Sequence, residues 1–209
     1  MTPAQRRPWA AWSTVFAACV LLLLVLAWQV MSDGLLTRID LRVTLWLASH
    51  RQPWLTQAML AVSEVHRTVG VLLAAGAVAA WLLLRRRRAD ALFLLAVPTG
   101  MLLNVGLKNV FERVRPVLDE PLVHLTTFSF PSGHAAASTL LYGALCTLAL
   151  PRRLAAIGAV AMVLLVCFSR VYLGAHYLTD VAAGIAVGIA WLLLARRALS
   201  WAACKSSTL

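Results

Sequence analysis

The chain has 209 residues, of which 61% are hydrophobic and 13% are charged. Soluble domains contain about 45–50% apolar and about 25% charged residues, so this composition, with a mean hydropathy of +0.81, excludes an ordinary cytosolic enzyme, a disordered chain and a secreted disulfide scaffold. The net charge of +11 is carried in short clusters between apolar stretches, which is typical of membrane proteins and not of nucleic-acid-binding domains. We therefore expect an integral membrane protein with no nucleic-acid partner.

Six apolar stretches predict an all-α fold with six transmembrane helices. They lie at Ser13–Met31, Thr68–Leu84, Ala91–Leu107, Ala135–Leu150, Leu154–Ser169 and Val181–Ala195. Several hold only 15–17 residues, so flanking polar residues must continue these helices across a hydrocarbon core of about 30 Å. Residues 1–209 are predicted to form a single six-span domain.

The segment between the first two spans, Ser32–Arg67, is too long for a turn. It is apolar on one side around Leu41–Leu47 and Trp54–Val65, and Pro53 separates the two pieces. This pattern favours two short interfacial helices. Their role stays open between shaping a lipid entrance and covering the helices.

The distribution of charge predicts how the chain is oriented. With six crossings and the N-terminus inside, the inner segments carry 11 of the 19 Lys and Arg residues and one acid, whereas the outer segments carry 8 cations and 7 acids. Positive charge is concentrated on the cytoplasmic side of membrane proteins. Both termini are therefore expected in the cytoplasm.

Three polar groups then fall on the outer side, and the first leaves the third span as Lys108-Asn-Val-Phe-Glu-Arg-Val-Arg115-Pro116. Lys108 and Arg115 are two helical turns apart and can share one face, and Pro116 is expected to end the helix near Arg115. Taken alone, such a basic helix end is an interfacial anchor. Arg113 is expected to face headgroups or an acid.

The second group, Phe130-Pro131-Ser132-Gly133-His134, stands immediately before the fourth span. The first backbone N–H groups of a helix lack intrahelical acceptors and lie at the positive end of its dipole, so they bind anions, phosphate in particular. His134 adds a titratable group beside that site. In isolation, an ordinary helix-start turn explains the pattern equally well.

The third group joins the fifth and sixth spans and runs from Ser169-Arg170 to His176 and Asp180. His176 and Asp180 are four residues apart and can share a helical face. A carboxylate there holds one imidazole nitrogen as N–H and leaves the other free as a nucleophile or base. Taken alone, a histidine and an aspartate at this spacing often form only an ordinary hydrogen bond.

Together the three groups suggest phosphoryl transfer. Lys108, Arg115 and Arg170 supply three positive charges suited to a phosphate and its transition state, and one histidine can attack phosphorus while the other protonates the departing oxygen. The local acids show no two-metal spacing, which argues against metal catalysis. We interpret them as a solvated loop; they are Glu112, Asp119 and Glu120.

The motifs K-x6-R-P, P-S-G-H and S-R-x5-H-x3-D, which read KNVFERVRP, PSGH and SRVYLGAHYLTD between residues 108 and 180, resemble the three motifs of the type-2 phosphatidic acid phosphatase superfamily. The resemblance implies that His176 is the nucleophile, Asp180 orients it, and His134 is the general acid. It also implies inhibition by vanadate and no cofactor or metal. The phosphate-binding residues it implies are Lys108, Arg115, Ser132, Gly133 and Arg170.

Within that superfamily the chain is similar to small lipid phosphatases of the bacterial inner membrane whose active sites face outwards. The expected substrate is a phosphomonoester or diphosphate lipid: undecaprenyl diphosphate, phosphatidylglycerophosphate or phosphatidic acid. A lipid phosphotransferase would use the same phosphohistidine, and a lipid-phosphate flippase is the alternative from another class. The sequence leaves open which lipid is the substrate, whether the phosphoryl group passes to water or to another lipid, and what the oligomeric state is.

Overall fold

The computed structural model describes residues 3–123, 125–148 and 151–206. Within these residues every regular element is a helix, which confirms the all-α fold. The helices are α1 (Pro3–Met31), α2 (Leu35–Ser49), α3 (Pro53–Val65), α4 (Thr68–Leu84), α5 (Arg88–Phe93), α6 (Ala96–Phe111), α7 (Gly133–Leu148), α8 (Arg152–Tyr172) and α9 (Leu178–Ser206).

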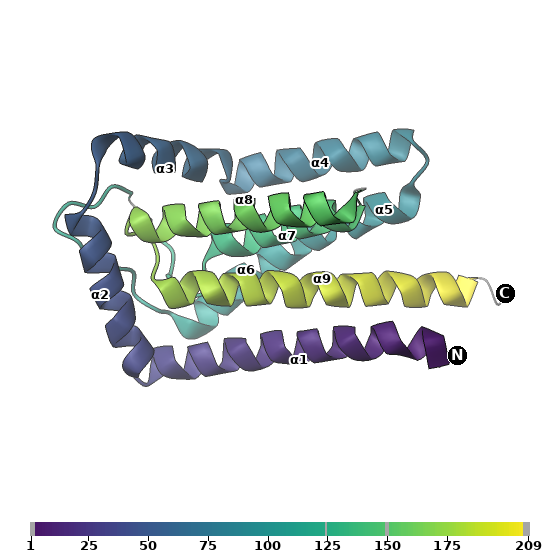
Figure 1. The fold of residues 1–209 in the computed structure, drawn as a ribbon, viewed down its shortest axis with the longest axis horizontal. Helices are drawn as coiled ribbons and strands as arrows, with labels where there is room; N and C mark the ends of the chain where they lie inside the picture. The colour runs from purple at the N-terminus through teal and green to yellow at the C-terminus, as the bar shows by residue number, and fades with distance from the viewer. Residues whose placement is uncertain (1–2, 124, 149–150, 207–209) are drawn as a thin grey trace.

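The helices form an elongated bundle in which α1, α4, α8 and α9 run along the long axis (Figure 1). Both ends of the chain lie at one end of this bundle, and so does the connection between α4 and α5. The Arg85–Arg88 cluster runs through this connection into the first residue of α5. Helix α2 lies across the opposite end. The bundle therefore has a basic end with both termini and a second end closed by α2.

Four helical segments are long and apolar enough to cross a membrane, and a fifth is counted if the bent pair α3 and α4 is one span. The four are Trp12–Met31, Arg88–Phe111, Arg153–Tyr172 and Leu178–Ala202. The predicted count of six is thus not confirmed. The remaining candidate, α7, has 16 described residues, about 24 Å of helix, and is packed against α6, α8 and α9.

Small residues let α9 approach the start of α7 closely. A Cβ atom added at Gly184 would lie 2.6 Å from the carbonyl oxygen of Ser132, and one at Gly188 would lie 2.7 Å from Cβ of Thr139. Any larger side chain at these two positions would push the helices apart. The close packing brings the first turn of α9 next to the turn that precedes α7.

The segment between α1 and α4 contains the two predicted helices, and Pro53 stands at the start of the second, where its missing N–H costs nothing. Helix α2 spans the end of the bundle (Figure 1). Helix α3 packs against α8 and meets α4 at a bend of 52°. Their helical structure is confirmed, whereas their interfacial position stays a prediction.

Candidate active site

A cavity of about 720 Å³ opens between α4, α6 and the start of α7. Five of the eight predicted site residues line it: Lys108, Arg115, Gly133, His134 and His176. The other three are almost completely buried, with exposed fractions of 0%, 1% and 0%: Ser132, Arg170 and Asp180. Residues from three separate motifs therefore meet at the end of the bundle opposite the termini.

Lys108 and Arg115 converge on one carbonyl oxygen, but not by sharing a helical face. Helix α6 ends at Phe111, and Glu112 follows with a left-handed backbone (φ 46°), so the prediction that the helix continues to Arg115 is wrong. Lys108 Nζ donates to the carbonyl of Phe128 at 2.5 Å and Arg115 Nη2 donates to it at 3.1 Å. The loop before α7, rather than helical periodicity, brings the two cations together.

The turn before α7 has the geometry of an anion site. Ser132 caps the helix, because its Oγ accepts a hydrogen bond of 3.5 Å from the backbone N–H of Ala135, and its own N–H donates to the carbonyl of Asp180 at 2.9 Å. The N–H groups of Gly133 and His134 belong to the first helical turn and have no intrahelical acceptor. They lie at the positive end of the helix dipole.

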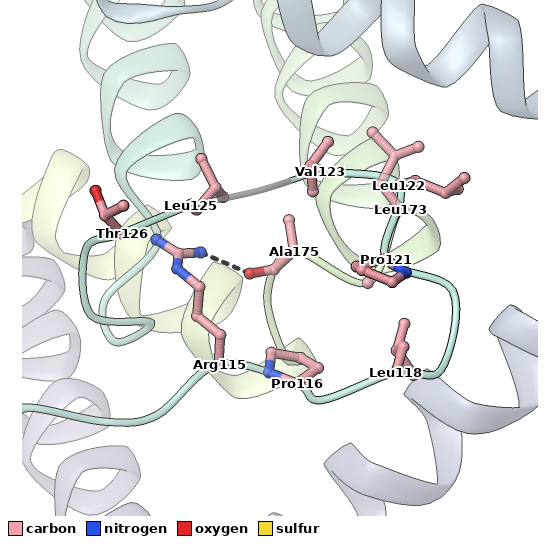
Figure 2. A pocket seen from close by; sticks show the side chains of 11 residues that line it. Arg115, Pro116, Leu118, Pro121, Leu122, Val123, Leu125, Thr126, Leu173 and Ala175 are labelled. Atoms are coloured by element: carbon pink, nitrogen blue, oxygen red, sulfur yellow. Dashed lines mark hydrogen bonds between the residues drawn. The ribbon is translucent and has the colours of Figure 1, made fainter.

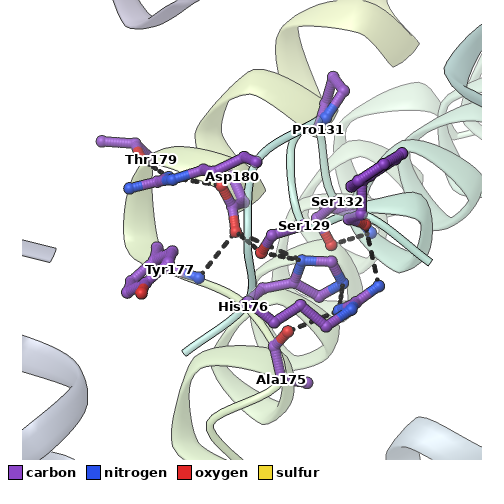
Figure 3. A network of polar contacts seen from close by, with 12 residues as sticks. Ser129, Pro131, Ser132, Ala175, His176, Tyr177, Thr179 and Asp180 are labelled. Carbon is purple, nitrogen blue, oxygen red and sulfur yellow. Dashed lines mark hydrogen bonds and ion pairs between the residues drawn. The ribbon is translucent and has the colours of Figure 1, made fainter. Parts of the chain in front are cut away.

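His176 precedes α9, and Asp180 lies in the first turn of that helix (Figure 3). The two residues are therefore not on one helical face, but Nδ1 of His176 lies 3.4 Å from Oδ2 of Asp180. The same oxygen accepts a 2.9 Å hydrogen bond from the backbone N–H of Tyr177, which is half of a capping box, and another from the hydroxyl of Ser129. These two donors hold the carboxylate beside the imidazole.

The tautomer of His176 follows from its neighbours. Arg115 Nη1 lies 3.1 Å from Nε2 of His176, and because a guanidinium can only donate, Nε2 carries the lone pair. The proton then sits on Nδ1, facing Asp180. Burial lowers the pKa of His176 to about 3, outweighing the opposing effect of Asp180, and burial also lowers the pKa of Arg115. His176 is therefore a neutral imidazole at the cavity wall, and its unprotonated Nε2 accepts a hydrogen bond from Arg115.

His134 also lines the cavity and is held there by α3. Its Nε2 lies 3.3 Å from the backbone carbonyl of Ser63, and since a carbonyl can only accept, Nε2 carries a proton and Nδ1 is the nitrogen left for a ligand. The hydroxyl of Ser63 accepts a hydrogen bond from Nη1 of Arg170. Among the described residues, Nε of Arg170 is one of three buried side-chain polar atoms without a hydrogen-bond partner.

Arg115 also borders a second cavity of about 360 Å³ on the outer side of the loop (Figure 2). Apolar side chains in its walls include Pro116, Leu118 and Leu173. Arg115 Nη1 donates to the carbonyl of Ala175 at 2.6 Å, the dashed line in Figure 2. Arg115 thus lines both this cavity and the larger one, which also contains His134 and His176.

Several residues at the site were not found from the sequence. Asp40, Ser63 and Ser129 each contact a predicted site residue or Arg113, but they stand far from the motif residues they contact and carry no local signal. Arg113 was expected to face headgroups or an acid. It is buried and pairs with Asp40 and Asp180, which confirms the prediction that it faces an acidic residue.

The three acids of the loop are exposed, as predicted: Glu112, Asp119 and Glu120. Within the described ranges, no three His, Cys, Asp or Glu side chains are grouped so that they can hold a metal ion. The buried charges at the site are instead cations and the carboxylates that face Arg113.

Comparison with known proteins gives consistent matches. The model of the PAP2 superfamily matches residues 89–203. Phosphatidylglycerophosphatase B of Bacillus subtilis is 35% identical over 155 residues, which cover 70% of this chain and 76% of that protein.

Two solved structures are similar in fold. A transmembrane PAP2-type phosphatidylglycerolphosphate phosphatase from Bacillus subtilis matches with a TM-score of 0.81 and 31% identity, covering 87% of this chain and 94% of that one. LpxE of Aquifex aeolicus has a TM-score of 0.64 at 23% identity, covers 76% of this chain and 95% of its own, and shows the fold alone.

The family match spans more than half of the chain and includes all three motifs, from Lys108 to Asp180. The similarity to a solved transmembrane phosphatase extends over most of the remaining helices, and the apolar helices agree with a multi-pass bacterial membrane protein. The chain therefore belongs to the PAP2 superfamily and is a membrane-bound phosphatase.

Proposed function

We propose that the protein hydrolyses the phosphate ester of a membrane lipid through a phosphohistidine at His176, without a metal ion. The observation that carries this proposal is that His176 lines one cavity with Lys108, Arg115 and His134, and that its unprotonated Nε2 lies 3.1 Å from Nη1 of Arg115. Arg170 is buried nearby with an unpartnered Nε. A nucleophile, cations and a proton donor are thus grouped around one space.

In the first step Nε2 of His176 forms a bond to phosphorus while the bond from phosphorus to the lipid oxygen breaks. The electron pair of that bond stays on the lipid oxygen, which takes a proton from Nδ1 of His134, whose protonated form is favoured by the negative charge of the bound phosphate ester. Phosphorylated His176 becomes cationic, and Asp180 balances its charge through the proton on Nδ1. The cations and the first N–H groups of α7 stabilise the charge on the phosphoryl oxygens.

In the second step water attacks the phosphoryl group. Neutral His134 accepts a proton from this water, a bond forms between phosphorus and the water oxygen, and the bond to Nε2 breaks. Inorganic phosphate leaves and His176 regains its lone pair, while His134 is protonated for the next cycle. The charges balance without any metal ion.

The cavity also accommodates a lipid tail. Its apolar wall comes from α4 and α6, and three of these residues are more than half exposed on the bundle surface: Val69 at 67%, Leu102 at 70% and Val105 at 54%. In a membrane this surface meets lipid, so the substrate enters sideways between α4 and α6. The phosphate then reaches the cations while the tail stays in the bilayer.

Among lipid phosphates we propose phosphatidylglycerophosphate as the first substrate, because the relative at 35% identity is a phosphatidylglycerophosphatase. Undecaprenyl diphosphate and phosphatidic acid are the competing substrates. The site lies at the end of the bundle opposite both termini and the Arg85–Arg88 cluster. With the basic end in the cytoplasm, the active site faces the outer leaflet of the inner membrane.

The test is phosphate release by purified protein in detergent and EDTA, with the three lipids compared side by side. We expect wild type to release phosphate, fastest from phosphatidylglycerophosphate, and His176→Ala to release none. His50→Ala is the matched control, because His50 is exposed and its Nδ1 bonds to the carbonyl of Trp46. Equal activity in His176→Ala, or activity that EDTA abolishes, would contradict the proposal.

A further inference from the structure

A buried charge network stands behind Asp180, on the side away from His176. Nη1 of Arg113 lies 2.6 Å from Oδ1 of Asp180, and its Nη2 lies 2.9 Å from Oδ2 of Asp40. The guanidinium also stacks on the ring of Tyr177 at 4.1 Å. Arg113 is 8% exposed and the two carboxylates are 1% exposed or less. A cation and two anions this deeply buried are costly unless each is fully paired.

Asp40 ties this network to the first turn of α9. Its Oδ1 accepts a 3.0 Å hydrogen bond from the backbone N–H of Thr179, and its Oδ2 accepts one from the hydroxyl of the same residue. Nη1 of Arg113 in turn donates to Oγ1 of Thr179 at 2.8 Å. Helix α2, which lies across the end of the bundle, thus supplies a carboxylate that holds both Arg113 and the residue before Asp180.

The two oxygens of Asp180 have separate partners. Oδ2 faces the imidazole of His176 and accepts from Ser129 and Tyr177 (Figure 3). Oδ1 instead accepts from Nη1 of Arg113. Arg113 therefore prevents the carboxylate from rotating about its terminal torsion, which is otherwise soft. The direction of the Nδ1 proton, and with it the direction of the Nε2 lone pair, depends on this restraint.

The charges also explain why Asp40 is needed. Alone, Arg113 would neutralise Asp180 and leave little negative charge to balance a phosphorylated His176. A second carboxylate shares the guanidinium, so the set of Arg113, Asp40 and Asp180 keeps a net charge of one negative unit. That unit is what a cationic phosphoimidazole requires.

We propose that Arg113 and Asp40 are positioning residues for phosphoryl transfer: they hold Asp180 so that His176 keeps Nε2 directed at phosphorus. This rests on the proposed phosphohistidine function. The network must then act on the transition state rather than on ground-state binding, since it touches neither the cavity nor the phosphate cations. Its loss is expected in kcat and not in KM.

The experiment compares Arg113→Gln, Arg113→Lys and Asp40→Asn with wild type, measuring kcat, KM, the unfolding temperature, and inhibition by vanadate and by inorganic phosphate. The matched control is Arg87→Gln, which removes an exposed arginine–aspartate pair at the opposite end of the bundle. We expect kcat to fall about 100-fold in Arg113→Gln, the effect of misplacing a reacting group by about 1 Å, with KM unchanged. Arg113→Lys recovers part of that loss.

Vanadate and phosphate separate positioning from simple loss of structure. A pentavalent vanadate must bond to Nε2 of His176, whereas phosphate needs only the cations, so Arg113→Gln should weaken vanadate inhibition about as much as kcat and leave phosphate inhibition unchanged. Equal weakening of both inhibitors with a lower unfolding temperature, or an unchanged kcat, would overturn the proposal. If Arg113→Gln does not fold, the same comparison of vanadate inhibition with phosphate inhibition is made in Asp40→Asn and Arg113→Lys. Failure of the proposed function itself would appear in wild type, as absent phosphate release.

Discussion

The two proposed catalytic histidines have very different surroundings. His176 faces a carboxylate that is itself bonded to Ser129, the backbone of Tyr177 and Arg113, and the network extends to α2. In the part of the chain that the structure describes, the imidazole of His134 has one hydrogen-bond partner, the backbone carbonyl of Ser63. One histidine is held by charge and the other by a neutral acceptor.

The difference matches what each residue must do. A nucleophile has to keep one tautomer and one orientation, and a carboxylate fixes both. A general acid has to gain and lose a proton in every cycle. A carboxylate beside it would strongly favour the imidazolium, whereas the carbonyl of Ser63 accepts the Nε2 proton in both protonation states and carries no net charge.

The largest expected effects come from deleting each histidine with two kinds of leaving group. His176→Ala should lose at least about 10⁴-fold in kcat with every substrate, because the covalent step is gone. In kcat/KM, which reports the phosphorylation of His176 and not the later attack by water, His134→Ala should lose about 10²–10⁴-fold with a lipid phosphate but much less with p-nitrophenyl phosphate, whose leaving group needs no proton. Steady-state kinetics with both substrates measure this. The same loss with both substrates in His134→Ala would contradict the assignment of His134 as the general acid.

The pH dependence of His176 sharpens the same contrast. Burial lowers its pKa to about 3, so between pH 6.5 and 3 the folded protein leaves this imidazole neutral while an exposed imidazole takes a proton. Burial of the neutral His176 imidazole is therefore compatible with full stability of the folded protein above pH 6.5, and that stability is progressively lost as the pH falls from 6.5 towards 3. Nitrogen NMR at pH 5, assigned with His176→Ala, should show a neutral ring with its proton on Nδ1; proton uptake centred near pH 6.5 would be inconsistent with the buried site.

A substitution at the lateral opening tests the path of the tail. Val105 lines the cavity and is 54% exposed, so Val105→Trp should narrow the entrance between α4 and α6. We expect KM to rise about 10-fold for a long-chain lipid phosphate, with little change for p-nitrophenyl phosphate. Val110→Trp, at an exposed position of the same helix, is the control. A matching effect on both substrates would argue against lateral entry.

The smallest effect is expected for Ser63→Ala. This change removes the hydroxyl that accepts from Arg170 but keeps the backbone carbonyl that holds His134. One lost hydrogen bond to a charged group corresponds to about 1.5–3 kcal/mol, and substrate phosphate replaces part of it, so KM should rise about 5-fold at unchanged kcat. A drop in kcat larger than the rise in KM would show that Ser63 acts on the acid as well.

The sequence predicted the helices and the motif residues because both leave local signals. Long apolar stretches predicted α1, α4, α8 and α9, and three short motifs predicted the residues around the cavity. The partners of those residues were not predictable in this way. Asp40 stands 139 residues before Thr179, and Ser63 stands 107 residues before Arg170; packing alone unites them.

Local geometry was predicted less well than the composition of the site. The helix was expected to end near Arg115, but a left-handed residue at Glu112 ends it earlier. His176 was expected to share a helical face with Asp180, but it precedes α9. In both places tertiary contacts override the helical period, and the predicted side chains meet by another route.

The central claim, a covalent phosphohistidine at His176, is tested most directly by trapping the intermediate. Wild-type protein in EDTA is mixed with lipid labelled with ³²P in its phosphate, quenched within one turnover in alkali, which preserves phosphohistidine, and digested for mass spectrometry. The account predicts an acid-labile phosphate on Nε2 of His176, more abundant at early times than at equilibrium and absent in His176→Ala. Phosphate release at the normal rate with no labelled protein, or with the label on another residue, would contradict it.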